Sequence, residues 1–424
     1  MKNFFNKIFK YNKKLNLKEK SFLEIIENTK VSNIFESIEK YNETSEARYV
    51  GGCVRKILNK EKFDDIDLAT NINPSELKDC LNKSNISFFE TGIDHGTITA
   101  NIENKNFEIT SLRKDVKTDG RHALVEYTND WNQDASRRDF TINSIYADFN
   151  GNLYDPFNGK KDIEHGIVKF IGDPEKRIKE DYLRILRYVR FFLNYSKVDH
   201  DQKIIKIIKQ NINGISKISS DRLLDELKKI VLSEGFLKIL DDKFFKEIIT
   251  LVFPQLINLN VLKNTNDYTK KIIEKRDFIF LISLMILDSS DNCEYFIYKY
   301  NISNEDKNRI RFLSNTLFKN FDKDTLKEKN LWKIFYFNGR NYLNDIFNFK
   351  LFQNKNLDKK IIKLKKFFET QKVPKFEIKA KMLVENFRYK EGKELGDKLK
   401  EIEKFWIENS FKITNEELNK IVKN

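Results

Sequence analysis

The sequence predicts an α/β domain with a mixed sheet and covering helices, followed by an all-α remainder. Short strand patterns cluster between residues 48 and 172, where they alternate with helical patterns. From Pro174 onward helical periodicity dominates, and only Pro254 and Pro374 follow, so long helices can run uninterrupted. The expected parts are an N-terminal extension with helices (1–47), an α/β head (48–172), a helical neck (173–255), and a helical body and tail (256–424).

The expected elements follow from local patterns along the chain. Apolar residues between 21 and 42 recur at helical spacing, and Tyr49-Val50 is typical of a short buried strand that ends at Gly51-Gly52. Asn73-Pro74-Ser75 is typical of a helix start, with proline in the first turn. The other predicted strands are Phe63–Leu68, Thr97–Ala100, Phe107–Leu112, Thr141–Phe149 and Val168–Ile171, with turns at Glu103–Asn106 and Asn150–Asn152.

Composition bounds the class of protein. Lys and Arg exceed Asp and Glu by 78 − 64 = 14, which favours a polyanionic partner, although a Lys-rich composition from AT-rich coding would give the same surplus. Three scattered cysteines without CxxC spacing argue against a zinc site and a disulfide framework, and indicate a reducing cytoplasm. No apolar run reaches the length of a membrane span. The basic stretch Met1–Lys20 is expected to be a solvated extension, with a transit peptide or a membrane-surface helix as alternatives.

A pair of aspartates follows the glycine turn. Asp65 and Asp67 lie one residue apart on the predicted strand, so their side chains should project from the same face and can bind the same metal ion. Gly51-Gly52 provides a turn narrow enough to approach phosphates. Paired carboxylates beside such a turn are what nucleotidyl transfer needs.

The segment Gly51–Arg55, together with Asp65-Ile66-Asp67, resembles the signature of the DNA polymerase β nucleotidyltransferase superfamily. More narrowly, it is similar to class II tRNA nucleotidyltransferases and bacterial poly(A) polymerases. The resemblance implies a nucleotidyltransferase head in which Asp65 and Asp67 bind Mg²⁺, with Glu108 as a candidate third catalytic carboxylate. It further implies that Gly51, Gly52 and Arg55 face the triphosphate. The family often has Arg-Asp where this chain has Arg55-Lys56, which puts the role of the missing acid in doubt.

Two later motifs extend the resemblance over the head. Asp119-Gly120-Arg121 is similar to the family's motif around a flexible loop, and the resemblance assigns Asp119 and Arg121 to the nucleotide site. The run Arg137–Asn143 resembles the family's Arg-Arg-Asp-x-x-x-Asn motif, which implies that Arg138, Asp139 and Asn143 bind the ribose and phosphates of the incoming nucleotide.

The segment Glu180–Arg187 bears on base choice. Asp181 and Arg184 lie three residues apart on an expected helix, hence on one face. A carboxylate there accepts from the exocyclic amine that cytosine and adenine share, whereas uracil and guanine present a carbonyl oxygen. The resemblance implies that this pair selects CTP and ATP, and it places Arg187 in the same site. The alternative is a salt bridge from Glu180 or Asp181 to Arg184.

The last motif of the resemblance is the segment Ser219–Leu227. In it, Arg222 and Glu226 are expected to brace the templating helix. The specific motifs cover residues 48–230. His95–Thr99 and the tail-like segment Glu391–Leu399 favour the CCA-adding branch.

The expected function is therefore Mg²⁺-dependent addition of CCA to tRNA from CTP and ATP. The basic helical half is expected to hold the acceptor arm through phosphate contacts. A poly(A) polymerase, a partial CC- or A-adding enzyme, and a catalytically silent RNA-binding protein stay open as alternatives. The sequence leaves the oligomeric state open.

Overall fold

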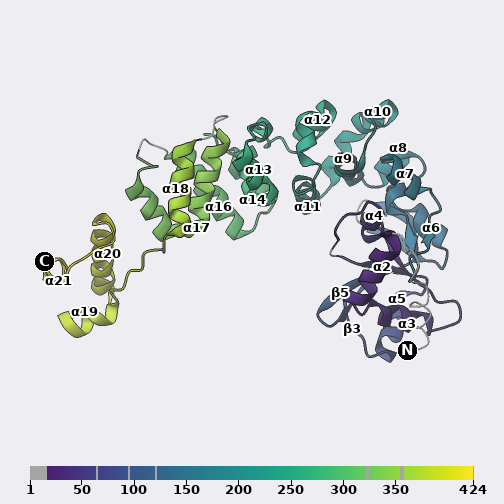
Figure 1. Ribbon diagram of the computed structural model, residues 1–424, viewed down its shortest axis with the longest axis horizontal. Coiled ribbons are helices and arrows are strands. Elements are labelled where there is room, and N and C mark those ends of the chain that lie inside the picture. The colour runs from purple at the N-terminus through teal and green to yellow at the C-terminus, as the bar shows by residue number, and fades with distance from the viewer. Residues whose placement is uncertain are drawn as a thin grey trace. The chain divides into compact units, whose positions relative to one another are not determined.

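The computed structural model describes residues 17–63, 65–93, 96–119, 122–320, 324–353 and 358–423. The chain divides into two compact units, residues 1–248 and 249–424. Unit 1, purple to teal in Figure 1, contains all strands of the described residues, and unit 2, green to yellow, is helical there. The predicted fold class, an α/β head followed by helices, is confirmed. The finer division at residues 172 and 255 stays a prediction.

A seven-stranded mixed sheet forms the centre of unit 1. Its strand order is β3-β4-β5-β2-β1-β8-β9, and only β2 and β5 run parallel among these pairs. The strands are β1 (Ala47–Val50), β2 (Asp67–Thr70), β3 (Ser87–Gly92), β4 (Thr97–Ile102), β5 (Lys105–Ser111), β8 (Tyr146–Ala147) and β9 (Leu153–Tyr154).

Helices cover both faces of this sheet, as the burial of consecutive residues in β1 requires. Tyr49 packs its ring against Phe22 and Phe35, at centroid distances of 5.2 and 4.9 Å, and so holds helices α2 and α3 on one face. Val50 points to the other face and shares a buried cluster with Trp131 of α6. The helices of unit 1 are α2 (Leu17–Asn28), α3 (Val31–Glu39), α4 (Gly52–Leu58), α5 (Pro74–Lys83), α6 (Trp131–Ser136), α7 (Gly159–His165), α8 (Pro174–Glu180), α9 (Leu183–Tyr195), α10 (Gln202–Asn211) and α11 (Ser220–Val231), with the unit boundary inside α12 (Lys243–Val252).

Several predicted elements are confirmed. The helical pattern between residues 21 and 42 is α2 and α3. Asn73 starts α5 through a capping box, since its side chain accepts the Glu76 backbone N–H and the Glu76 side chain accepts its own. The turn at Asn150–Asn152 joins β8 to β9, with Gly151 at φ +83°.

Three predicted strands are corrected. The strand expected at Phe63–Leu68 begins only at Asp67, because the chain leaves β1 at Gly51 (φ +69°) and enters α4, so β1 offers no partner beyond that point. Thr141–Phe149 contains the 3₁₀ turn η2 (Thr141–Asn143) before the short β8, because Ser144 and Asn143 bond back to the local chain instead of extending. Val168–Ile171 contributes a single bridge, between Phe140 and Phe170.

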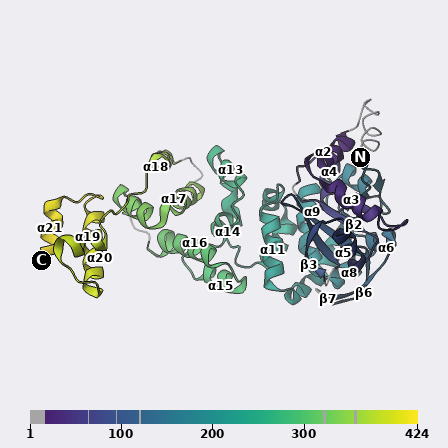
Figure 2. The same ribbon diagram turned by 90° about the horizontal axis from the view of Figure 1, so that it is seen from below.

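A two-stranded hairpin, in a segment where the sequence analysis predicted no strand, lies between β5 and β8 in the chain. It pairs β6 (Arg113–Asp119) with β7 (His122–Tyr127), and Figure 2 shows it at the margin of unit 1. The alternation His122-Ala-Leu-Val-Glu-Tyr127 is weak because Ala123 to Val125 are consecutive apolar residues. Strand β3 was also missed, since Phe88-Phe89 lie inside a polar stretch.

Aromatic packing joins the head to the helices that follow it. Phe140, which comes directly after the Arg-Arg-Asp run, lies against Phe170 (4.6 Å between centroids) and against Phe191 of α9 (5.3 Å). Phe170 in turn stacks on Tyr188 of α9, with 14° between the rings. This core fixes α9 beside the motif, which positions the polar side chains of both segments.

Unit 2 is helical in its described residues. The tail has its own core, formed by Leu383, Leu395, Ile402, Leu418 and Val422. Its helices are α13 (Asp267–Glu274), α14 (Phe278–Ile286), α15 (Asn292–Lys299), α16 (Asn304–Ser314), α17 (Glu328–Gln353), α18 (Lys359–Thr370), α19 (Ala380–Phe387), α20 (Lys393–Glu408) and α21 (Asn415–Lys423). No described helix is both long and apolar enough to cross a bilayer.

Candidate active site

A cavity of about 520 Å³ opens in unit 1 between the glycine turn, the Arg-Arg-Asp run and the start of α9. Within the described residues, eight arginines and three aspartates line it, a surplus of 8 − 3 = 5 positive charges that suits a polyphosphate. The lining residues are Gly51, Gly52, Arg55, Asp67, Arg113, Arg137, Arg138, Asp139, Asn143, Asp181, Leu183, Arg184, Arg187, Arg190, Phe191 and Arg222.

The glycine turn brings backbone, cation and carboxylate together. Gly51 needs its positive φ of +69° to turn the chain from β1 into α4. A Cβ at Gly51 would lie 3.5 Å from Nη1 of Arg138, and a Cβ at Gly52 would lie 3.7 Å from Oδ2 of Asp67. The two glycines therefore leave free the space between the arginine and the aspartate.

Asp67 is the predicted metal ligand that reaches this cavity. It starts β2 on the same face as Ala69, which packs in the Trp131 cluster, and it pairs in register with Glu108 of the parallel strand β5. Asp65 precedes the strand, is exposed, and is absent from the cavity lining. The argument that both aspartates share a strand face is therefore wrong.

The other two predicted carboxylates, Glu108 and Asp65, still affect the pKa of Asp67. Burial and the negative charges of Glu108 and Asp65 raise the pKa of Asp67 to about 6, against the lowering effect of Arg138 and Arg55. Among the residues that the structure describes, no three His, Cys, Asp or Glu side chains are close enough together to hold a metal ion by themselves. A hard cation prefers carboxylate oxygens, and this concentration of negative charge beside the cavity fits one.

Arg55 is more deeply placed than a surface phosphate ligand. Its guanidinium donates to Oδ1 of Asn143 and lies over the rings of Phe191 and Tyr195, with Cζ 4.8 and 5.2 Å from their centroids. Arg55 thus joins α4 to α9 while it lines the cavity.

The predicted ribose and phosphate residues form one buried network. Asp139 accepts from Nδ2 of Asn143 at 2.8 Å and pairs with Nε of Arg187 at 2.6 Å. Burial alone would raise the pKa of Asp139, but the Arg187 charge and hydrogen bond, together with that from Asn143, outweigh it and hold this pKa at about 2. Arg138 donates to the Asn143 carbonyl at 3.4 Å. The site is therefore ordered by its own side chains.

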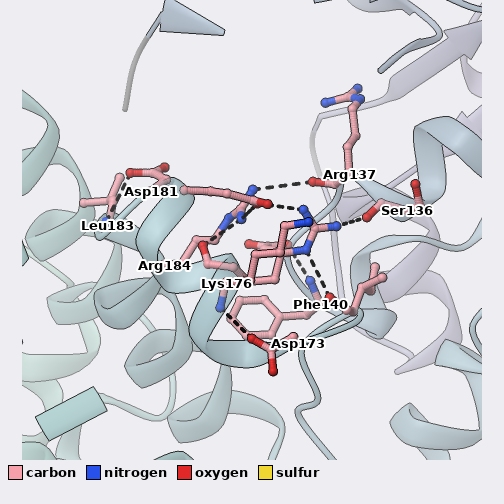
Figure 3. A network of polar contacts seen from close by, with 12 residues as sticks. Ser136, Arg137, Phe140, Asp173, Lys176, Asp181, Leu183 and Arg184 are labelled. Atoms are coloured by element: carbon pink, nitrogen blue, oxygen red, sulfur yellow. Dashed lines mark hydrogen bonds and ion pairs between the residues drawn. The ribbon is translucent and has the colours of Figure 1, made fainter. Parts of the chain in front are cut away.

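The predicted templating pair lies at the junction of two helices, which Figure 3 shows. Asp181 is extended (φ −155°, ψ 105°) between α8 and α9, so the expectation that it lies within a helix is wrong. Its Oδ1 accepts the Leu183 backbone N–H at 3.2 Å, because a short polar side chain satisfies a donor at the start of α9. Both Asp181 and Arg184 nevertheless line the cavity.

Each member of this pair has a partner of its own. Arg184 pairs with Glu180 at 2.6 Å and donates to the carbonyl oxygens of Arg177 and Arg137, at 2.8 and 3.5 Å. The salt bridge considered as the alternative thus exists, with Glu180, and it leaves Arg184 on the cavity wall. Oδ2 of Asp181 accepts from Arg222 at 2.8 Å.

Helix α11 supports α9 as expected. Besides the Arg222–Asp181 contact, Glu226 of α11 is 1% exposed and pairs with Arg190 of α9 at 2.5 Å. The predicted bracing of the templating segment by Arg222 and Glu226 is confirmed. Arg222 also lines the cavity, which the sequence analysis did not anticipate.

Sequence reasoning missed other cavity residues. Arg190 and Phe191 belong to the face of α9 that carries Arg184 and Arg187, and their helical spacing is a signal that was available. Arg113 starts β6, and no local pattern marks it. Four residues of the resembling motifs are affected by the limits of the description: His95, Gly120 and Arg121 lie outside the described residues, and so does the side chain of Asp119.

Comparison with known proteins gives this geometry a family. The protein-family model described as the poly A polymerase head domain matches residues 47–169 of this chain. Human CCA tRNA nucleotidyltransferase 1, mitochondrial, is 47% identical over 196 residues, which are 45% of this chain and 44% of that protein. The aligned part spans 44–45% of the human, mouse and zebrafish relatives.

A longer alignment and a shared fold extend the comparison. The CCA-adding enzyme of Staphylococcus haemolyticus is 31% identical over 304 residues, which are 64% of this chain and 73% of that enzyme. The crystal structure of the Bacillus stearothermophilus CCA-adding enzyme in complex with CTP has the same fold, with a TM-score of 0.66 and 19% identity over 89% of this chain and 92% of that one. Because this chain matches 73% of the Staphylococcus haemolyticus enzyme at 31% identity, it belongs to the family of CCA-adding enzymes.

Proposed function

We propose that this protein adds CCA to the 3′ end of tRNA, with CTP and ATP as substrates and pyrophosphate as the released product. The observation that carries the proposal is the arginine-rich cavity, which combines the glycine turn, Asp67 and the Asp181–Arg184 pair. The names of the sequence relatives support the same activity. Separate solved relatives are described with CTP and with a primer tRNA and an ATP analogue.

The reaction forms a bond between the 3′ hydroxyl oxygen of the tRNA and the α-phosphorus, and the hydroxyl proton passes to solvent. The bond from that phosphorus to the bridging oxygen breaks, and pyrophosphate leaves with the electron pair. Arg138 and the Gly51–Gly52 turn would hold the triphosphate, while Asp139 and Asn143 would orient the ribose. Because Asp139 and Asn143 are already fixed by Arg187 and Arg55, ordering the site on nucleotide binding costs little entropy.

Magnesium dependence is part of the proposal. Asp67, with the charges of Asp65 and Glu108 close to it, would hold the ion. When bound, Mg²⁺ would supply electrostatic stabilisation of the attacking and leaving oxygens. Asp67 then has to be ionised, and a neighbouring cation favours the ionised form.

Base choice would rest on Asp181 and Arg184. The Asp181 carboxylate would accept from the exocyclic amine of C or A, and Arg184 would donate to a ring acceptor on the same edge. The contact with Arg222 holds the carboxylate in place. A carbonyl oxygen on U or G would face the lone pairs of Asp181 and be rejected.

Unit 2 would hold the tRNA acceptor arm, mainly through phosphate contacts. Helix α18 presents four exposed lysines, which are Lys359, Lys360, Lys363 and Lys366. We assign the protein to the cytoplasm, for which its three free cysteines provide support. A mitochondrial location is the alternative, since the human relative carries that word in its name.

The test is nucleotide incorporation by the purified protein with Mg²⁺ or with EDTA. The primers are tRNAs that end before CCA, after C and after CC, each with CTP, ATP or both. Three additions that then stop, only with Mg²⁺, are the expected result. Extension that stops after CC, or that occurs only on the CC-ended tRNA, would replace the proposal with a partial activity. An open-ended A ladder would replace it with poly(A) polymerase activity.

A further inference from the structure

A buried carboxylate lies directly behind the cavity wall. Asp134 of α6 is 1% exposed, does not line the cavity, and none of the sequence motifs assigned it a role. Its position follows from α6, whose Trp131 and Ala135 pack in the cluster with Val50 and so turn Asp134 inward. Burying a carboxylate costs free energy unless its oxygens are fully hydrogen-bonded or ion-paired, so the partners of Asp134 define its role.

Those partners are the two adjacent arginines of the cavity wall. Oδ1 of Asp134 pairs with Arg137, at 2.6 Å to Nη2 and 2.8 Å to Nε. Oδ2 pairs with Arg138, at 3.1 Å to Nη2 and 3.3 Å to Nε. Each guanidinium is therefore bonded through its Nε–Nη2 edge to a different oxygen of the same carboxylate.

Two further contacts fix the carboxylate itself. The Tyr146 hydroxyl donates to Oδ2 at 2.6 Å and accepts from Nε of Arg138 at 3.1 Å. The backbone N–H of Arg113, at the start of β6, donates to Oδ1 at 3.3 Å. Asp134 thus connects the sheet, the β6–β7 hairpin and both arginines.

We infer that Asp134 is a positioning residue, which aims Arg137 and Arg138 at the triphosphate of the incoming nucleotide. The Nη1 group of Arg138 points away from Asp134 toward Gly51, where it would meet a Cβ at 3.5 Å. One carboxylate neutralises only one of the two guanidinium charges, so a positive charge is left for the ligand. This inference rests on the proposed function and extends it to the residue that orients the phosphate-binding arginines.

The variant Asp134→Asn tests this inference because it keeps the shape of the side chain and removes its charge. A carboxamide has only one acceptor oxygen, so at least one of the two arginines loses its ion pair with the side chain at position 134. We expect KM for CTP and for ATP to rise together by roughly 10- to 100-fold, as for other residues that orient a binding group. KM for tRNA and the ratio of C to A incorporation should stay unchanged. Binding of inorganic triphosphate, measured by calorimetry, should weaken by a similar factor.

Asp130→Asn is the matched control. Asp130 caps the same helix, is exposed, and accepts the Asn132 N–H at 2.8 Å, which asparagine also does. Tyr146→Phe provides a second, milder variant, which removes one hydrogen bond from Oδ2 and should raise the nucleotide KM in the same direction by less.

The possible outcomes distinguish a failure of the inference about Asp134 from a failure of the proposed function. An unchanged KM for CTP and ATP in a folded Asp134→Asn protein would overturn the inference, as would an equal rise in the Asp130→Asn control. If Asp134→Asn fails to fold, an unchanged nucleotide KM in Tyr146→Phe has the same meaning. A wild-type protein that binds triphosphate but transfers no nucleotide would overturn the proposed function instead.

Discussion

Asp67 and Glu108 occupy the same register position on the parallel strands β2 and β5, so their side chains leave the sheet on the same face. The neighbouring charge of Glu108 helps raise the pKa of Asp67 to about 6, after burial as the larger cause. Such a pair of like charges is unfavourable alone and favourable around a cation. The geometry therefore ranks the carboxylates, with Asp67 on the cavity wall and Glu108 and Asp65 in support.

Asp67→Asn should abolish incorporation while tRNA binding persists. Loss of metal-ion stabilisation amounts to several kcal/mol in the transition state, which is a loss in kcat of roughly a thousandfold. Glu108→Gln should reduce kcat less, because Glu108 is exposed and outside the cavity lining. Incorporation assays with a gel-shift measurement of tRNA binding would check both variants. Parallel loss of tRNA binding and thermal stability in Asp67→Asn would mean that Asp67 holds the fold instead.

The sequence predicted the parts of this site that depend on local spacing. Gly51, Asp67 and the Arg-Arg-Asp run are local motifs, and the structure brings them to one cavity. What could not be predicted depends on long-range packing. Asp65 lies outside β2 because the partner strand β1 ends where the chain turns at Gly51. Asp134 is buried behind the cavity wall because Trp131 anchors its helix in the core. Neither effect is encoded within a window of a few residues.

The contact between Asp181 and Arg222 predicts a change in base choice. Arg222→Gln should leave Asp181 without its charged partner and loosen the template, so that UTP is accepted more often relative to CTP. A well-placed polar pair contributes about 1–3 kcal/mol of discrimination, or roughly five- to 150-fold. Single-turnover incorporation of UMP and CMP on a tRNA that lacks CCA would measure the ratio. Glu226→Gln is the comparison, because it removes the ion pair from α11 to Arg190 of α9 and leaves Asp181 bonded to Arg222.

The Asp139–Arg187 pair predicts a pH-dependent contribution to stability. The pKa of Asp139 is about 2 in the folded protein, below the usual value of 3.8. A depressed carboxyl pKa stabilises the folded state above the unfolded pKa, and this contribution disappears as the pH falls through the folded one. Asp139→Asn should therefore lower the free energy of unfolding at pH 7 by on the order of 2 kcal/mol.

The difference between wild type and Asp139→Asn should shrink between about pH 5 and pH 2. Urea unfolding of both proteins across this range would measure it, and other carboxylates cancel in the comparison. A difference that stays constant with pH would show that Asp139 acts through packing and hydrogen bonds rather than through its charge.

The exposed lysines of α18 predict how tRNA binding responds to salt. Replacing Lys359, Lys360, Lys363 and Lys366 by glutamate should raise KM for tRNA and flatten its dependence on the logarithm of salt concentration, because each lost phosphate contact removes about one released counterion. KM for CTP should not change, since every described residue that lines the cavity lies in unit 1. The matched control replaces the same four lysines by arginine, which keeps every charge and should preserve the salt dependence. Equal tRNA affinity and salt slope in the wild type and the glutamate variant would exclude α18 as a phosphate-binding face, and the lysines would then serve only as a solvated helix surface.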